Sequence, residues 1–166
     1  MIQIQTPRLT LRHARPDDLT AVHAIMADRE VLRYWSTPPH DNVEQTREWL
    51  GGMIERNGQG SFDFLIEHDG QVIGKMGAYE LPDFGYYLAR GAQGKGFARE
   101  ALGAFIAYVF DHGVDFLTAD TDPRNAPSIK LLTDAGFAET GRAERTWLVG
   151  DEWCDSVYFR LDKPTG

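Results

Sequence analysis

The chain has 166 residues, of which 42% are hydrophobic and 25% are charged, and its formal net charge is -8. This length suits a single domain over residues 1–166, and the composition excludes collagenous, low-complexity and wholly disordered proteins. The acidic balance argues against a nucleic-acid partner, because a phosphate backbone repels a protein of like charge, and it favours small cations or basic peptides as ligands.

No stretch of the sequence approaches the roughly 20 apolar residues that a membrane span needs, and residues 1–12 lack the apolar run of a signal peptide. We therefore expect a cytoplasmic protein that does not engage a membrane. Cys154 is the single cysteine, which rules out an intramolecular disulfide. The five histidines have no partner at metal-ligand spacing, so we expect no metal site.

The first half of the chain predicts a strand, two helices and a hairpin. Residues 6–12 alternate apolar and polar side chains, which is typical of a strand with one buried face. Apolar residues at helical spacing predict a helix over residues 19–27 and a second helix after Asn42. The period then changes to two, which predicts strands over residues 62–66 and 72–79 joined by a tight turn.

The second half predicts an alternation of strands and helices that ends in a hairpin. Its segments are a strand from Phe84 to Leu88, a strongly periodic helix over residues 98–110, a buried strand from Phe116 to Thr121, a helix capped by Asn125 that ends before Gly136, and two strands over residues 137–149 and 153–161. This order predicts an α+β fold of three layers, in which helices flank one mixed sheet.

A glycine loop, Gln93-Gly94-Lys95-Gly96-Phe97-Ala98, lies where a predicted strand leads into the most periodic helix. Two glycines let an anion approach the main chain, and the helix dipole adds positive character there. A Walker loop is excluded because Gly96 follows Lys95, and the dinucleotide fingerprint is excluded because Arg99 stands at its third glycine. For the glycines alone, a turn before a solvated helix is as good an interpretation as a phosphate site.

The flanking residues favour the phosphate site, because they match a known family. Gln93-x-x-Gly96-x-Ala98 resembles the pyrophosphate motif of the GNAT superfamily of N-acetyltransferases, and Asn125-x-x-Ser128 before Gly136-Phe137 resembles the downstream half of that signature. Three further motifs resemble the branch that includes ribosomal-protein N-terminal acetyltransferases: Thr6-x-Arg8-Leu9-x-Leu11-Arg12, Gly85-Tyr86 and Trp153-x-Asp155. The resemblance extends over almost the whole chain.

The resemblance implies a mostly antiparallel seven-stranded sheet, splayed at its fourth strand and flanked by about four helices. It also implies acetyl coenzyme A as the cosubstrate, with its pantetheine arm on the backbone near Leu88 and Ala89 and its pyrophosphate on the loop from Gln93 to Ala98. Within that loop the expected contacts are Gln93, Gly94, Lys95, Gly96, Phe97 and Ala98. An amide contact from Asn125 to the cofactor arm is implied as well, beside its role as a helix cap.

Acetyl transfer to an alkylamine requires a proton acceptor, because such an amine with a pKa near ~10 is protonated at neutral pH. Asp83 stands where relatives often carry Glu and is our first candidate base, with Glu80 or a water chain as alternatives; each acid also suits an exposed turn. The departing thiolate gains from a hydrogen-bond donor. Many GNAT enzymes use Tyr there, but Leu132 occupies that position, and Ser128 is the matching hydroxyl of the ribosomal-protein branch.

The acceptor is expected to be a primary amine, either on a small molecule or at a peptide amino terminus. Tyr34, Trp35, His40 and Trp147 are the candidates for the acceptor cleft, although core packing is the better interpretation for at least two of them. Cys154 has no activating neighbour in the sequence, which favours direct transfer in a ternary complex. A coenzyme A sensor without catalysis is the alternative function, and a homodimer is left open.

Overall fold

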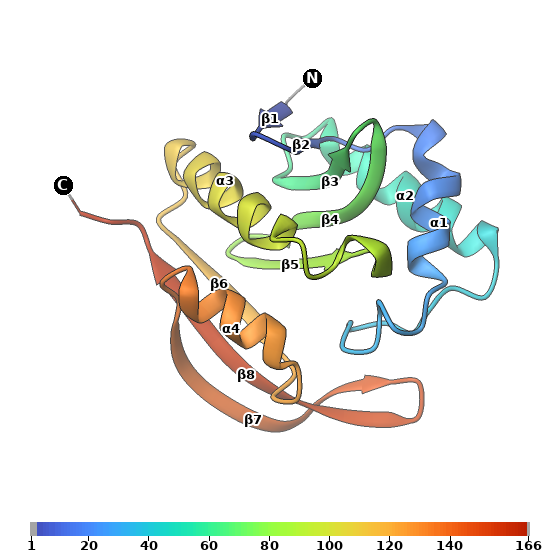
Figure 1. The fold of residues 1–166 in the computed structure, drawn as a ribbon. Coiled ribbons are helices and arrows are strands. Elements are labelled where there is room, and N and C mark those ends of the chain that lie inside the picture. Colours follow the sequence, from blue (N-terminus) through green and yellow to red (C-terminus); the bar gives the residue numbers. More distant parts are fainter. Residues whose placement is uncertain (1–2, 166) are drawn as a thin grey trace.

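The computed structural model describes residues 3–165, and its centre is an eight-stranded sheet in the order β1-β2-β3-β4-β5-β6-β8-β7 (Figure 1). The strands are β1 (Gln3–Gln5), β2 (Thr10–Arg12), β3 (Asp63–His68), β4 (Gln71–Glu80), β5 (Asp83–Leu88), β6 (Phe116–Thr121), β7 (Ala138–Val149) and β8 (Glu152–Asp162). The helices are α1 (Leu19–Met26), α2 (Val43–Asn57), α3 (Phe97–Asp111) and α4 (Ala126–Asp134), with short 3-10 turns at Pro16–Asp18 and Arg90–Ala92.

The predicted fold class is confirmed, and the opening segment supplies one strand more than the seven expected. The single strand predicted over residues 6–12 is instead the second half of a hairpin, in which β1 pairs antiparallel with β2. Residues between the two strands form a turn, where the amide of Thr6 donates to the carbonyl of Leu9 at 2.9 Å. Pro7 lies inside this turn, where its missing N–H costs no ladder hydrogen bond.

The sheet opens between β5 and β6, at the fourth of the strands predicted from sequence. These two strands run parallel but pair at a single register position, Asp83 with Thr118. The amide of Thr118 also donates to the carbonyl of Pro82 at 2.9 Å, so contact is confined to the start of β5. Figure 1 shows the two strands diverging beyond this point. The edge of β5 that faces β6 is therefore without a strand partner over most of its length.

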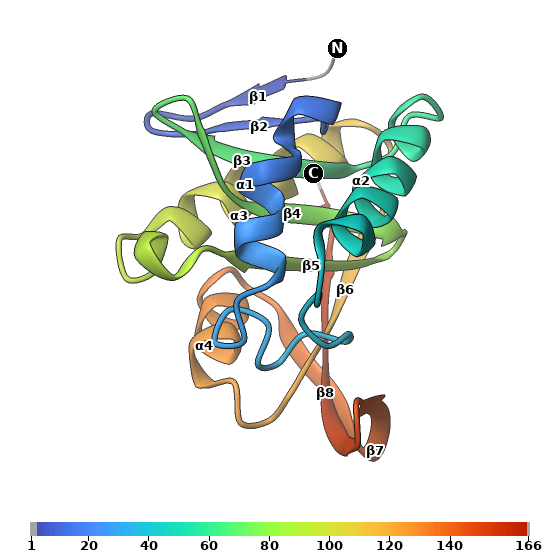
Figure 2. The same ribbon diagram turned by 90° about the vertical axis from the view of Figure 1, so that its right-hand side faces the viewer.

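Helices cover both faces of the sheet. In Figure 2, α1 and α2 lie in front of the strands and α3 lies behind them. Successive residues of β3 point to opposite faces, so Phe64 packs in the cluster that includes α3, while Leu65 packs in the cluster that includes α1 and α2. Both side chains are fully buried. Among residues 3–165, none of the helices has the length and apolar character needed to span a bilayer.

Candidate active site

The open edge of β5 presents backbone groups of alternate residues. The amide of Ala89 donates to the carbonyl of Ile73 at 2.7 Å, inside the sheet. Because neighbouring residues of a strand direct their backbone groups to opposite edges, Leu88 and Tyr86 present theirs toward β6. The carbonyl of Leu88 already accepts from Nε2 of Gln93 at 3.2 Å. The expected pair of contact residues is therefore corrected: Tyr86 and Leu88 face the gap, whereas the amide hydrogen of Ala89 is used within the sheet.

The glycine loop presents its amides outward at the start of α3. Gly94 and Gly96 have φ values of 75° and 81°, a backbone conformation that glycine adopts without a Cβ penalty. Among residues 3–165, no acceptor lies within hydrogen-bond distance of the amide hydrogens of residues 94–98, and the first bond of the helix is from Glu100 to the Gly96 carbonyl. Unpaired amides at a helix amino terminus bind anions, so the loop fits a diphosphate.

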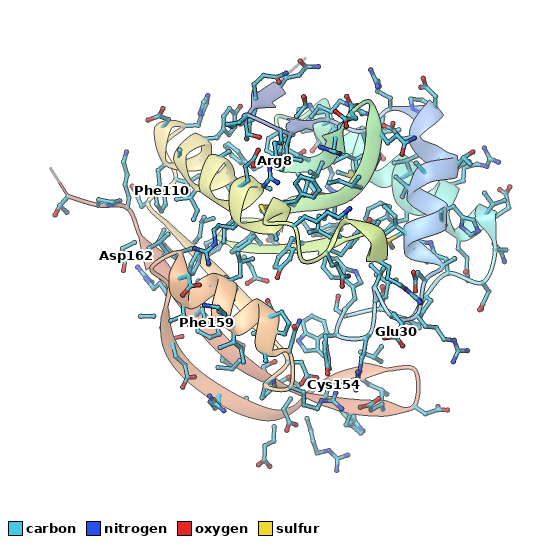
Figure 3. All side chains as sticks on the ribbon, viewed as in Figure 1. Arg8, Glu30, Phe110, Cys154, Phe159 and Asp162 are labelled. Atoms are coloured by element: carbon cyan, nitrogen blue, oxygen red, sulfur yellow. The ribbon has the colours of Figure 1, made fainter. Side chains whose placement is uncertain are left out.

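Arg8 holds this loop from the amino-terminal hairpin, and Figure 3 shows it beside α3. Its Nη1 donates to the carbonyl of Lys95 at 2.9 Å, and its Nε donates to Glu100 at 2.7 Å. Thr6 and the amide of Arg8 donate to the same carboxylate. The guanidinium also lies 4.5 Å from the ring centre of Phe97. The opening motif therefore fixes the loop through one arginine and one glutamate.

Replacing Arg8 with glutamine is expected to raise KM for acetyl coenzyme A by about three- to tenfold while kcat stays within about twofold, because the loop loses an ionised donor but no reacting group. Arg8→Lys should restore only part of the affinity, since an ammonium lacks the fork of donors. Steady-state kinetics checks both variants, with Arg47→Gln on the exposed face of α2 as the control. An unchanged KM would show that the contact to Lys95 is dispensable.

A cavity of about 750 Å³ joins the open edge of β5 to the glycine loop and α4. Its lining includes the predicted cofactor residues Leu88, Gln93, Gly94, Gly96, Phe97, Ala98 and Asn125, together with Ser128. Four basic side chains and two acidic ones line it: Arg33, Arg99, Arg124, Lys130, Glu30 and Asp120. This cavity is termed the cofactor cleft below. Its basic excess contrasts with the net charge of the chain and suits a polyanionic ligand.

Asn125 and Ser128 lie together at the start of α4. The Asn125 side chain accepts from the amide of Ser128 at 3.3 Å, so its oxygen caps the helix while its amide nitrogen remains available at the cleft. Ser128 is buried and lines the cleft together with Tyr86. Burial raises the pKa of Tyr86, and the nearby Ser128 hydroxyl partly offsets this rise. The structure therefore places a pair of neutral hydroxyl groups, Tyr86 and Ser128, in the wall of the cofactor cleft.

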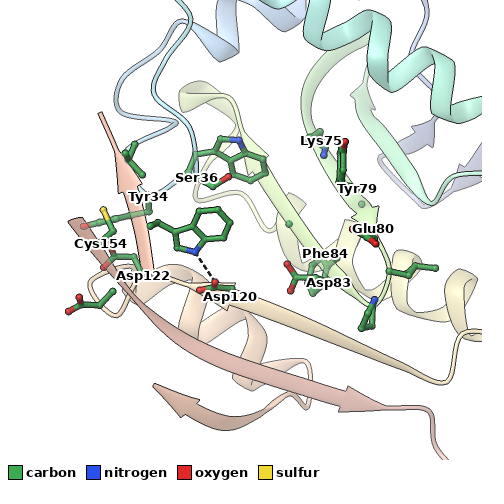
Figure 4. A pocket seen from close by; sticks show the side chains of 18 residues that line it. Tyr34, Ser36, Lys75, Tyr79, Glu80, Asp83, Phe84, Asp120, Asp122 and Cys154 are labelled. Carbon is green, nitrogen blue, oxygen red and sulfur yellow. Dashed lines mark hydrogen bonds between the residues drawn. The ribbon is translucent and has the colours of Figure 1, made fainter. Parts of the chain in front are cut away.

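A second cavity, of about 700 Å³, is lined by the end of β4 and the start of β5 and is shown in Figure 4. Five carboxylates line it: Glu80, Asp83, Asp120, Asp122 and Asp155. The basic residue in its lining, Lys75, pairs with the buried Asp63 at 2.8 Å and so adds little free positive charge. Its aromatic side chains are Tyr34, Trp35, Tyr79, Phe84 and Trp147. This cavity is termed the acceptor cavity, and it suits a ligand that is both apolar and cationic.

The two cavities share part of their lining and therefore meet. The shared residues are Tyr34, Trp35, Phe84, Gly85 and Asp120. An added Cβ at Gly85 would lie 3.2 Å from the Trp35 ring, so glycine allows the ring to approach the strand. Asp120 accepts a hydrogen bond from the Trp147 indole at 2.8 Å, the dashed line in Figure 4. A ligand in each cavity would thus come into contact at Gly85, with Asp120 beside both.

Asp83 lies in the wall of the acceptor cavity at the base of the opening between β5 and β6. Asp83 is an exposed residue, yet the surrounding protein partly desolvates its carboxylate and so raises the pKa of Asp83. A hydrogen bond from Thr118 at 3.1 Å lowers this pKa, and the negative charge of Asp120 raises it. A carboxylate with a raised pKa is a better proton acceptor near neutral pH than an ordinary aspartate.

The structure brings most of the predicted acceptor residues together but leaves one elsewhere. Tyr34, Trp35 and Trp147 line the acceptor cavity, whereas His40 lines a separate cavity of about 570 Å³ with Thr37 and Trp49. The amide of His40 donates to the carbonyl of Met26 at 2.9 Å, which ties it to the end of α1. His40 as an acceptor-cleft residue is therefore not supported.

Sequence reasoning missed three of the five carboxylates. Asp120 and Asp122 alternate at the end of β6, and Asp155 lies on β8. The sequence does carry a signal for Asp120 and Asp122, because two acidic residues at alternate positions near the end of a predicted buried strand share one face. Asp122 is neutralised by Arg124, whose Nη2 lies 2.7 Å away, which leaves Asp120 as the missed acid nearest the junction. Cys154 also lines the acceptor cavity, but burial raises the pKa of its thiol, which disfavours a nucleophilic thiolate.

A model of the GNAT acetyltransferase domain matches residues 8–138. The chain belongs to the GNAT acetyltransferase family. It is 31% identical over 151 residues to the N-acetyltransferase p20 of Bacillus licheniformis, covering 85% of each chain. It is 25% identical to the spermidine N(1)-acetyltransferase of Vibrio cholerae, covering 89% of each. A solved structure of a ribosomal L7/L12 alpha-N-protein acetyltransferase with coenzyme A has the same fold, with a TM-score of 0.86, 20% identity, and 97% of this chain and 98% of that chain covered.

Proposed function

We propose that this GNAT enzyme transfers the acetyl group of acetyl coenzyme A to a cationic primary amine, by direct attack in a ternary complex. The observation that carries the proposal is the meeting of two cavities of opposite charge character at Gly85. A basic cleft suits the polyanionic cosubstrate, and an acidic aromatic cavity suits the amine. Because both cavities open onto the same stretch of β5, nitrogen and thioester would lie side by side.

The cofactor cleft fits acetyl coenzyme A in three respects. The unpaired amides of residues 94–98 suit its diphosphate, and the backbone of Tyr86 and Leu88 at the open edge suits the amides of its pantetheine arm. The free amide nitrogen of Asn125 gives one more donor at the same wall. When bound, this cosubstrate supplies an activated acyl thioester.

The residues of the chain supply the proton transfers. Asp83 accepts a proton from the ammonium form of the substrate, and its raised pKa favours that role. Asp120 attracts the ammonium to the junction and is held in place by Trp147. Ser128 donates a hydrogen bond toward the leaving sulfur, supported by the hydroxyl of Tyr86. Leu132, which is buried at the position of the family tyrosine, offers no donor.

The acceptor class follows from the acidic cavity. A spermidine acetyltransferase and a ribosomal-protein acetyltransferase stand among the similar proteins, so both small polyamines and peptide amino termini are represented. Among residues 3–165, Asp83 and Asp120 form no salt bridge with a basic side chain, and carboxylates of this kind favour an amine that carries a further positive charge. Acceptors with a nearby carboxylate are disfavoured, since they would place like charges in an acidic cavity.

The test is calorimetry with acetyl coenzyme A, followed by thiol release over a panel of amino acids, polyamines, aminoglycosides and short peptides. We expect binding at micromolar concentration and turnover of cationic members of the panel. Absence of binding at millimolar concentration would refute the proposal. Binding without thiol release on any amine would instead identify a coenzyme A sensor.

A further inference from the structure

Two basic side chains from different helices share one carboxylate at the edge of the cofactor cleft. Arg99 lies in the first turn of α3 and Lys130 lies in the middle of α4. Nη2 of Arg99 lies 2.6 Å from Oδ2 of Asp134, and Nζ of Lys130 lies 2.9 Å from the same oxygen. Asp134 therefore holds the two cationic groups close to one another.

The pair retains a positive excess that faces the cleft. Both Arg99 and Lys130 line the cofactor cleft, whereas Asp134 does not. Their side chains are 65% and 74% exposed, so most of their donors remain available to a ligand. Two cations against one carboxylate leave a net charge of about +1, and the guanidinium keeps donors that Asp134 does not use.

Two other arginines near the cleft, Arg90 and Arg124, are more fully neutralised. Arg90 pairs with Asp28 beside the glycine loop. Arg124 lies between two carboxylates, Asp122 at 2.7 Å and Glu152 at 2.9 Å. Neither arginine offers the uncompensated charge that Arg99 and Lys130 offer together. Arg99 and Lys130 thus lie together in the lining of the cleft, joined by one carboxylate, and keep a net positive charge.

We propose that Arg99 and Lys130 form a subsite for the 3′-phosphate of coenzyme A. The inference rests on the proposed function, because that function places the diphosphate on the amides of residues 94–98. The remaining anionic group of the cosubstrate is the phosphate monoester on its ribose, which carries a charge of about -1.5 to -2 at neutral pH. Arg99 follows Gly96 by three residues and lines the same cleft, and the phosphate monoester is on the ribose that carries the diphosphate, so the two anionic groups can contact neighbouring parts of one wall.

Asp134 positions the two cations in the free protein and competes with the ligand. Salt bridges from Asp134 restrict two flexible side chains, which lowers the entropy that binding would otherwise cost. The same carboxylate repels a phosphate dianion at short range. Removal of this charge is therefore expected to strengthen binding of the phosphate monoester.

The experiment compares coenzyme A with 3′-dephospho-coenzyme A by calorimetry on the full chain. For the unchanged protein, we expect coenzyme A to bind about tenfold more tightly. Arg99→Gln and Lys130→Gln are each expected to weaken coenzyme A binding by about threefold, with little change for the dephospho ligand. Asp134→Asn should strengthen coenzyme A binding alone. The preference for coenzyme A should also fall as salt is raised.

Arg160→Gln is the matched control, because Arg160 is an exposed arginine of β8 that pairs with Asp162 outside the cleft. It should leave the ratio of the two affinities unchanged. Equal affinity of the unchanged protein for the two ligands would overturn the subsite while the proposed function stood. An equal loss of both affinities in the Arg99 and Lys130 variants would also overturn it. Failure of either ligand to bind would overturn the subsite and the proposed function together.

Discussion

Replacing Asp83 with asparagine is expected to lower kcat/KM for the amine by about a hundredfold or more, because the acceptor cavity loses its proton acceptor. Asparagine has nearly the same shape and keeps an oxygen for the hydrogen bond from Thr118. Binding of acetyl coenzyme A should stay within about twofold, since Asp83 does not line the cofactor cleft. Steady-state kinetics and calorimetry on the same preparation check both expectations.

The pH dependence of kcat/KM tests the role of Asp83 as the base independently. A base must be unprotonated to act, so kcat/KM should fall as the pH drops through the pKa of Asp83, which burial raises above its ordinary value. The charge of Asp120 raises that pKa further. Asp120→Asn removes this charge, so the acidic limb of the profile should move to lower pH. A limb that stays in place would show that Asp83 is not the titrating group.

Glu80→Gln is the matched control, because Glu80 lines the same cavity but lies at the end of β4, farther along the chain from the junction at Gly85. Its loss should weaken amine binding by no more than about threefold, the usual worth of an exposed charge. If Glu80→Gln were the more damaging change, Glu80 would replace Asp83 as the base. If neither change mattered across pH, a water chain would carry the proton.

Most of the fold could be predicted from the hydrophobic periodicity of the sequence and from the residue types at its turns. The predicted bounds of β6 agree with the structure at both ends, and the Asp69-Gly70 turn has the positive φ values, 50° and 79°, that a tight hairpin requires. The opening hairpin was missed, because β1 has three residues with only Ile4 apolar and therefore no readable period. Its pairing with β2 is set by the turn at Pro7 rather than by a hydrophobic pattern.

The backbone geometry of the cofactor cleft was easier to predict than the set of side chains that line the acceptor cavity. Glycines with positive φ and helix-start amides act through backbone, so local sequence specifies them, as at Gly94 and Gly96. The acceptor cavity is assembled from loops and from strands far apart in the chain. Asp120 and Trp147 are 27 residues apart, and their hydrogen bond exists only because β7 and β6 belong to one sheet. His40 was misplaced for the same reason, since no local pattern gives the path of its loop.

Gly77→Ala is expected to cause the largest loss of stability, because the backbones of β3 and β4 lie very close together at this residue. A Cβ on Gly77 would lie 2.4 Å from the Cα of Asp63 and 2.4 Å from the carbonyl oxygen of Phe62, both backbone atoms. Gly77→Ala must therefore push β4 away from β3, where the two residues pair in register. That shift also disturbs the buried bridge between Asp63 and Lys75. We expect a loss of about 3 kcal/mol or more in the free energy of unfolding, measured in urea.

Gly51→Ala is also a glycine-to-alanine change, but it is expected to raise the stability of the protein. Gly51 lies within α2, and an added Cβ there meets no atom within 4 Å. Alanine removes the entropic disadvantage of glycine in a helix, so stability should rise by roughly 0.5–1 kcal/mol. The Gly51 variant thus measures the effect of helix propensity, and the Gly77 variant measures the effect of close packing between two strand backbones.

Because Gly77 lines the acceptor cavity, Gly77→Ala should also raise KM for the amine in the protein that remains folded. A Gly77 variant as stable as the unchanged chain would mean that β3 and β4 are not packed this closely.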